Sequence, residues 1–328
     1  MLQSFGRLES GFDHHLSAGK REPVIHGKWI VCALLASIVV VGSLMMRDHL
    51  MIASSRPAFA AVFLSLIGLA LARVVARRPA NRFQHAARDL AENIFLFVAT
   101  TLLGVIASYP VAVATSGFAD ASLQKIDLAL HFNWVEWYLT VSRHPSLQVI
   151  GSAAYASIYL SPVLIVTAMA CLGQRCEARQ FLAAFWLAEV MTLALFMAFP
   201  AVGPLAFLWH QPIPYMPTSA LYQEQLIPAL RAHRLTHVDL GALRGLVCAP
   251  SFHTTAAMLY MLAAWPIRQL RWPIIAINVV MLLAVPVEGT HYLSDMIGGA
   301  IVAMIAWAAI RLLAWSLLRR NQVVLLRS

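Results

Sequence analysis

Eight apolar segments of roughly membrane-spanning length constrain this chain more than any other feature of it. The hydrocarbon core of a bilayer is about 30 Å thick, and a helix needs about 20 apolar residues to cross it. Only 12% of the residues are charged, against about 25% in ordinary soluble domains, so a soluble globular fold is excluded. The sequence therefore predicts an all-α polytopic membrane bundle. The eight expected spans are 29–46, 57–76, 93–116, 147–171, 181–200, 254–270, 273–289 and 293–318.

The basic residues fall unequally on the two sides of this topology. With eight spans both termini share one side, and that side holds 17 of the 24 Lys and Arg residues. The other side holds Arg47, Arg56, Lys125, Arg143, Arg231, Arg234 and Arg244. Cytoplasmic loops are enriched in Lys and Arg, so we expect a protein of the cytoplasmic (inner) membrane with both termini in the cytoplasm. The net charge of +9 then reflects topology, and no nucleic-acid partner is expected.

Two long connections, 117–146 and 201–253, lie on the predicted outer side. The first carries Trp134, Trp137 and Tyr138 among charged residues, which is typical of a helix anchored in the membrane interface. The second is rich in proline and predicts an irregular cap. Loops of this length are uncommon unless they are functional, so chemistry is expected on the outer face.

Two polar clusters adjoin the last three predicted spans on this outer side. The first, residues 248–253, reads C-A-P-S-F-H and precedes the sixth span. Pro250 suits a helix start, where Ser251 and the free first-turn amides favour an anion such as phosphate. The second, residues 288–295, reads E-G-T-H-Y-L-S-D and precedes the eighth span.

His291 and Asp295 are four residues apart, which places them on one face of a helix. A carboxylate that accepts one imidazole N–H fixes the tautomer and leaves the other nitrogen free to attack phosphorus. His253 would give a proton to the departing oxygen. The spacing alone is not specific, because His85 and Asp89 repeat it in a basic cytoplasmic loop without a companion cluster.

These residues resemble the phosphatidic acid phosphatase type 2 superfamily, whose second motif is P-S-G-H and whose third is S-R-x5-H-x3-D. Pro250, Ser251 and His253 match the second motif with Phe252 in place of glycine, and His291 and Asp295 match the end of the third. The resemblance implies that His291 becomes phosphorylated, that Asp295 supports it and that His253 protonates the leaving group.

The departures from the family pattern indicate a branch. Val285 stands where the third motif has arginine, and no K-x6-R-P first motif is present. This pattern is similar to the inositol phosphorylceramide synthase-like branch. The resemblance implies a six-helix catalytic core at 90–318, preceded by a tail at 1–28 and by two extra helices with a basic loop at 29–89, and followed by a tail at 319–328.

Positive charge must still compensate a bound phosphate. Arg244 and Arg231 are the expected phosphate-binding cations, together with Ser251 and Phe252 at the helix start. Glu189 lies in the middle of the fifth span, where we expect a structural hydrogen bond. Glu288, three residues before His291, either tunes that histidine, binds a headgroup or faces water.

We therefore expect a lipid phosphatase or phosphotransferase that acts on a lipid phosphate or phosphodiester at the outer membrane face, in contact with the bilayer and without a cofactor. Two alternatives remain open. His253, His291 and Asp295 would form a two-histidine, one-carboxylate metal site in a metal-dependent hydrolase. A lipid-binding or transport protein without catalysis would use charges at the membrane midplane, for which Glu189 is the sole candidate.

Overall fold

A computed structural model of the chain describes residues 24–53, 60, 64–65, 67–69, 71 and 81–325, the side chains of 321–325 excepted. Six helices in these ranges are long and apolar enough to cross a membrane. They are α2 (Gly27–Arg47), α4 (Arg82–Val113), α7 (Pro145–Cys171), α8 (Arg175–Ala198), α12 (Arg271–Glu288) and α13 (Leu293–Leu325). The predicted all-α membrane bundle is confirmed. The expected span 57–76 lies mostly outside the described residues.

Several helix boundaries differ from those predicted, and two of the differences have a local cause. The third expected span began at residue 93, but α4 begins at Arg82 because the Asn81 side chain caps it, accepting a hydrogen bond from the Gln84 amide at 3.0 Å. The sixth expected span ended at residue 270, but α11 (Phe252–Ala264) is only 13 residues long. Pro266 follows closely, and a proline has no backbone N–H with which to continue the helical hydrogen bonds.

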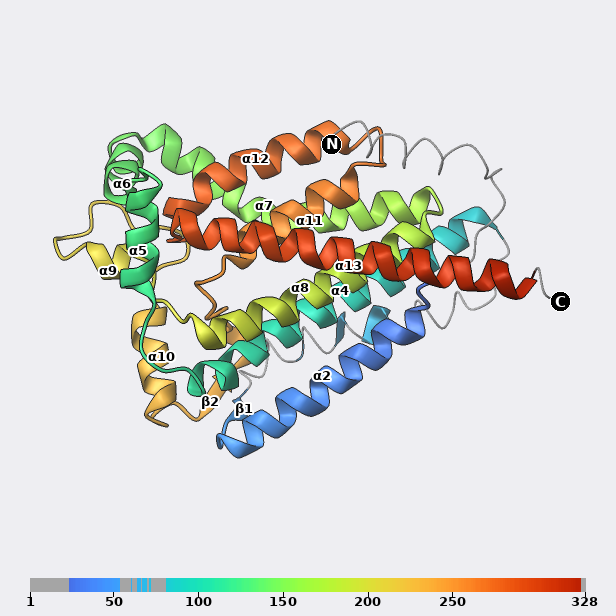
Figure 1. Cartoon of the computed structure of the whole chain (residues 1–328), viewed down its shortest axis with the longest axis horizontal. Helices are drawn as coiled ribbons and strands as arrows, with labels where there is room; N and C mark the ends of the chain where they lie inside the picture. The colour runs from blue at the N-terminus through green and yellow to red at the C-terminus, as the bar shows by residue number, and fades with distance from the viewer. Residues whose placement is uncertain are drawn as a thin grey trace.

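The short helix α11 lies at the centre of the bundle, in contact with α7, α8, α12 and α13 (Figure 1). Its Ala256, Ala257 and Ala263 are fully buried, and small residues of this kind let neighbouring helices approach closely. The helix α4 packs on α7 and α8, and α2 lies along the outside of α4. This arrangement surrounds the start of α11 with other helices.

The outward faces of the long helices carry exposed apolar side chains. Leu35, Val39, Tyr159, Trp272 and Leu283 each leave more than half of their surface accessible. Exposed apolar surface of this extent marks an interaction face rather than a solvated one. Together with the six apolar helices, it identifies an integral membrane protein.

The remaining elements gather at one end of the bundle (Figure 1). They are α5 (Asp120–Ala129), α6 (Trp134–Arg143), α9 (Pro204–Leu208), α10 (Gln223–Arg231), a 3-10 helix (Leu240–Ala242) and two short strands. The strands β1 (Met51–Ala53) and β2 (His237–Asp239) pair in parallel, with Met51 opposite His237. The connection 201–253 thus contains regular structure, which a proline count did not predict.

The aromatic residues of α6 correct one expectation. Trp134 and Tyr138 are fully buried, and only Trp137 is exposed. The Trp134 indole N–H donates to the Pro286 carbonyl at 2.7 Å, and the Tyr138 hydroxyl donates to the Tyr215 carbonyl at 2.7 Å. The interface-anchor prediction was therefore wrong for these two residues, because buried Trp and Tyr use their polar groups to bind neighbouring backbone.

Candidate functional site

The two polar clusters meet where α11 and α13 begin. The Ser251 amide donates a hydrogen bond to the Asp295 carbonyl at 3.1 Å, and the Thr255 hydroxyl donates to the Gly299 carbonyl at 2.9 Å. A side chain at residue 299 would collide with the Ser251 carbonyl, so glycine is needed for this approach. These contacts hold the first turn of α11 against the first turns of α13.

His253 and His291 face each other across this junction. Their ring centroids are 5.9 Å apart, and the ring planes meet at 56°. His291 is 3% exposed, whereas His253 is half-buried. Segments 38 residues apart in sequence therefore bring two imidazoles to one place at one end of the bundle.

Asp295 supports His291 from the same helix end. Its Oδ1 lies 3.1 Å from Nδ1 of His291, and its Oδ2 accepts a hydrogen bond from the Tyr292 amide at 2.9 Å. The relative orientation of the two groups does not meet the criteria for a hydrogen bond. Among the described residues, neither Nδ1 of His291 nor Oδ1 of Asp295 has another hydrogen-bond partner. Because Nδ1 faces the carboxylate, Nε2 is the nitrogen of His291 that is left for chemistry.

Tyr155 of α7 is a site residue that sequence reasoning missed. Its ring stacks on His253 with centroids 4.4 Å apart, and its hydroxyl lies 3.4 Å from His253 Nδ1. Burial, and then the nearby His291, lower the pKa of His253 to about 3. The His253 ring is therefore neutral at neutral pH, with Nε2 as its nitrogen away from Tyr155.

Two aspartates of α5 fix the segment that carries His291, and they were also missed. Asp127 is fully buried and accepts hydrogen bonds from the amides of Leu293 at 2.9 Å and Ser294 at 2.7 Å. Asp120 accepts from the Tyr292 hydroxyl at 3.0 Å, and burial raises the pKa of this carboxyl. Asp127 thus caps α13 from a different helix, so no local motif indicates it.

Glu288 anchors the long connection instead of facing water. It is 1% exposed and accepts hydrogen bonds from the Tyr215 hydroxyl at 2.7 Å, the Thr218 hydroxyl at 2.6 Å and the Thr218 amide at 3.1 Å. The water-facing interpretation of Glu288 was therefore wrong. The carboxylate ties the segment around Tyr215 to the end of α12, beside the histidine pair.

The four residues expected to bind phosphate have different contacts in the structure. Ser251 caps α11, accepting a hydrogen bond from the Thr254 amide at 3.3 Å. The Phe252 ring packs edge-on against Phe185, with centroids 5.5 Å apart, so its side chain belongs to the core. In the part of the chain that the structure describes, no direct contact joins Arg244 or Arg231 to the histidine pair.

The two arginines differ in how far they are engaged. Nε and Nη2 of Arg231 donate to the Thr115 hydroxyl at 3.0 and 2.8 Å, and Nη2 also donates to the Gly117 carbonyl at 2.8 Å. Arg244 is exposed, and its guanidinium lies 5.3 Å from the Tyr222 ring centroid. Arg244 is therefore the more available cation.

His85 and Asp89, which repeat the H-x-x-x-D spacing, contact basic residues away from the histidine pair, and Glu189 of the fifth predicted span packs against a neighbouring helix. Asp89 forms ion pairs with Arg88 at 3.0 Å and with Arg175, and Arg175 Nη2 lies 3.1 Å from His85 Nδ1. These residues lie at the opposite end of the bundle from the histidine pair. The Glu189 side chain is buried against Gly104, where a larger residue would collide with the carboxyl group.

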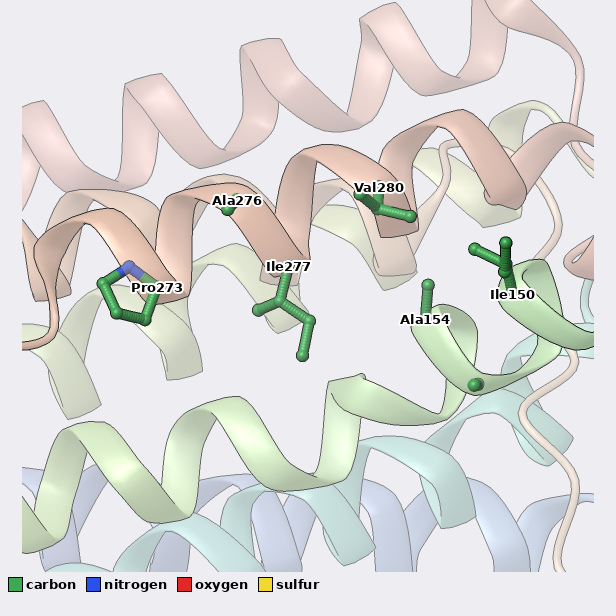
Figure 2. Close-up of a pocket in the computed structure, with 7 residues that line it drawn as sticks. Ile150, Ala154, Pro273, Ala276, Ile277 and Val280 are labelled. Carbon is green, nitrogen blue, oxygen red and sulfur yellow. The ribbon is translucent and has the colours of Figure 1, made fainter.

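Apolar grooves lie beside the site, between α7 and α12. The larger, about 500 Å³, is lined by Ile150, Ala154, Ile277 and Val280 among others (Figure 2). A second, about 230 Å³, shares Ile150 and Val280 and reaches Glu288. Neither groove contains the histidine pair, but together they run along the bundle towards it.

One group of potential metal ligands occurs in the described ranges. It consists of Cys248, His291 and Asp295, whose ligand atoms lie within 4.8 Å of one another. The facial site considered from sequence required His253 as the third ligand, but this group contains Cys248 in place of His253.

Comparisons with known proteins give one match. A family model described as the PAP2 superfamily matches residues 121–309, more than half of the chain and a range that includes both polar clusters. No curated protein and no solved structure matches the chain.

Proposed function

Because the chain belongs to the PAP2 superfamily, we propose that it is a lipid phosphatase or phosphotransferase that works through a phosphohistidine at His291. The observation that carries this proposal is the convergence of two imidazoles, 5.9 Å apart, with the Asp295 carboxylate behind one of them. The catalytic core in this proposal is 90–318, with α2 and the segment after it as additions.

In the first step, Nε2 of His291 attacks the phosphorus of the bound lipid. As the lipid binds, Nε2 of His253 takes a proton from its phosphate group. The bond from phosphorus to the leaving oxygen then breaks, and that oxygen takes this proton from Nε2 of His253. Asp295, at 3.1 Å from His291 Nδ1, keeps the proton on Nδ1 and stabilises the positive charge that the ring gains. The product is a phosphorylated His291 and a neutral His253.

In the second step, an acceptor hydroxyl attacks the same phosphorus from the vacated side. His253 now accepts the proton from the acceptor oxygen, and the phosphorus–nitrogen bond to His291 breaks. If the acceptor is water, the product is inorganic phosphate or a phosphate monoester. If the acceptor is a lipid or sugar alcohol, a new phosphate monoester or phosphodiester forms, according to the donor, and the enzyme is a transferase.

The start of α11 supplies the anion site in this proposal. The first-turn amides of a helix have no carbonyl partner within the helix, and the helix dipole adds positive potential there. Phe252 contributes its backbone amide, since its side chain packs on Phe185. Arg244 supplies the cation, because two nitrogens of Arg231 are already engaged by Thr115 and Gly117.

The distribution of charge supports a site at the outer face. The end of the bundle that holds the histidine pair carries, in the described residues, Arg47, Lys125, Arg143, Arg231, Arg234 and Arg244. The opposite end has more basic residues, and the side richer in Lys and Arg is cytoplasmic. The grooves between α7 and α12 offer an apolar surface for lipid chains beside the site (Figure 2).

Resemblance to the inositol phosphorylceramide synthase-like branch favours transfer to an alcohol, which is an argument by analogy. The test is to incubate purified protein with phosphate-labelled lipids, with and without an alcohol acceptor, beside a His291→Gln variant. Label in free phosphate indicates a phosphatase, and label in a new lipid indicates a transferase. Turnover that His291→Gln leaves unchanged contradicts the proposal.

A further inference from the structure

A cysteine lies within the candidate site although no step of the proposed reaction uses it. Cys248 is 1% exposed, and its sulfur, a ring nitrogen of His291 and a carboxylate oxygen of Asp295 all lie within 4.8 Å of one another. His291 and Asp295 are 3% and 2% exposed. These three residues, here called the thiol cluster, are therefore enclosed by protein on almost every side.

The thiol cluster has unused bonding capacity. Among the described residues, His291 Nδ1 and Asp295 Oδ1 make no hydrogen bond of good geometry. The Cys248 thiol reaches one acceptor, the Thr290 carbonyl, at 3.7 Å. Buried polar atoms are nearly always satisfied in native proteins, so two unsatisfied atoms beside a loosely bonded thiol indicate room for a further bonding partner.

The donor set matches the preferences of zinc. Zn²⁺ takes thiolate, imidazole and carboxylate ligands at about 2.0–2.3 Å in tetrahedral geometry, which holds ligand atoms about 3.4–3.7 Å apart. Nδ1 of His291 and Oδ1 of Asp295 already lie 3.1 Å apart, and the cluster as a whole needs to close by about 1 Å. A thiolate ligand favours soft cations over Mg²⁺ and Ca²⁺.

We propose that the thiol cluster binds a thiophilic divalent cation, with Zn²⁺ as the reference ion, and that an occupied cluster is inactive. The Cys248 thiol loses its proton to water as the sulfur–metal bond forms. The imidazole proton of His291 moves from Nδ1 to Nε2, which frees the Nδ1 lone pair to bind the ion. The bound ion coordinates the Asp295 carboxylate and Nδ1 of His291. The carboxylate can then no longer support His291 during the reaction, and the enzyme is inactive. The inhibition rests on the proposed function of His291, whereas the binding does not.

Binding is measured without any enzyme assay. Cd²⁺ is titrated into purified protein, and the ultraviolet thiolate-to-cadmium absorption is recorded for the wild type and for Cys248→Ser. We expect this absorption in the wild type and its loss in the variant. A matched control replaces the other three cysteines, Cys32, Cys171 and Cys176, with serine and should keep the signal. A signal that survives in Cys248→Ser, or that disappears in the triple variant, overturns the proposal.

Inhibition is measured as the Zn²⁺ concentration that halves turnover. Loss of a supporting residue around a bound metal weakens binding about 10- to 100-fold. With the turnover of each variant expressed relative to its own metal-free rate, loss of the Cys248 ligand should raise this concentration at least about tenfold. Cys248→Ala, which removes the donor atom altogether, should behave like Cys248→Ser. Equal Zn²⁺ sensitivity of both variants and the wild type contradicts the proposal. A protein that binds Cd²⁺ through Cys248 but never turns over lipid phosphate refutes the proposed function alone.

Discussion

Asp127 offers the sharpest test of how the fold positions the site. Its buried carboxylate accepts hydrogen bonds from the Leu293 amide at 2.9 Å and the Ser294 amide at 2.7 Å, at the start of the helix that carries Asp295. A hydrogen bond to a charged group contributes about 1.5–3 kcal/mol, and loss of a helix cap costs about 0.5–2 kcal/mol. Since these effects overlap, Asp127→Ala should lower the free energy of unfolding by about 2–4 kcal/mol.

Activity should fall as well, because His291 and Asp295 lose the cap that fixes their helix. A misplacement of about 1 Å in a reacting group can reduce the rate about 100-fold, and we expect kcat of Asp127→Ala to fall by about 10- to 100-fold. Asp127→Asn keeps one acceptor oxygen and should be affected less. The assay combines thermal unfolding in detergent with turnover of a lipid phosphate.

The matched control for Asp127 is Glu224→Ala. Glu224 is an exposed acid in the first turn of α10, at the same end of the bundle. Its replacement should change stability by less than about 0.5 kcal/mol. Unaltered stability and turnover in Asp127→Ala, or equal damage from Glu224→Ala, would refute the positioning role.

Three further predictions concern the chemistry. His253→Ala should slow substrates with poor leaving groups more than those with good ones, and equal slowing would count against a proton donor. Because the pKa of His253 is lowered to about 3, the proton must arrive on a phosphate monoester of pKa about 6. Accordingly, kcat/KM should decline above about pH 6, approaching tenfold per pH unit, and a flat profile from about pH 6 to 8 contradicts this. Arg244→Ala should raise KM for the lipid phosphate with little loss of stability, whereas Arg231→Ala should mainly lower thermal stability. If Arg231→Ala raises KM and Arg244→Ala lowers stability instead, Arg231 is the phosphate-binding cation.

The sequence predicted the membrane bundle and the placement of the two polar clusters on one side because both depend on local patterns. Apolar length alone indicates a span, and the helix-start residues around Ser251 and His291 are contiguous in sequence. Because two predicted spans separate the clusters, both clusters fall on the same side of the membrane. The structure places them in direct contact, through the Ser251 amide and the Asp295 carbonyl.

The supporting residues could not be predicted because their partners are far away in sequence. Asp127 contacts an amide 166 residues later, and Tyr155 contacts a ring 98 residues later. A buried acid cap and a solvated surface acid look the same in a single sequence. Likewise Trp134 suits an interface helix as well as a buried one, and only its contact with Pro286, 152 residues away, distinguishes the two.

The proposed reaction requires His291 to carry the phosphoryl group between donor and acceptor. To test this, the protein is mixed with a phosphate-labelled lipid, the reaction is stopped in alkali, where phosphohistidine survives, and the label is located by mass spectrometry. His253→Ala, with its slowed proton transfer, serves as a second sample. We predict covalent label on His291 and its loss in a folded His291→Gln variant. Label on another residue, or turnover that continues without His291, would contradict the account.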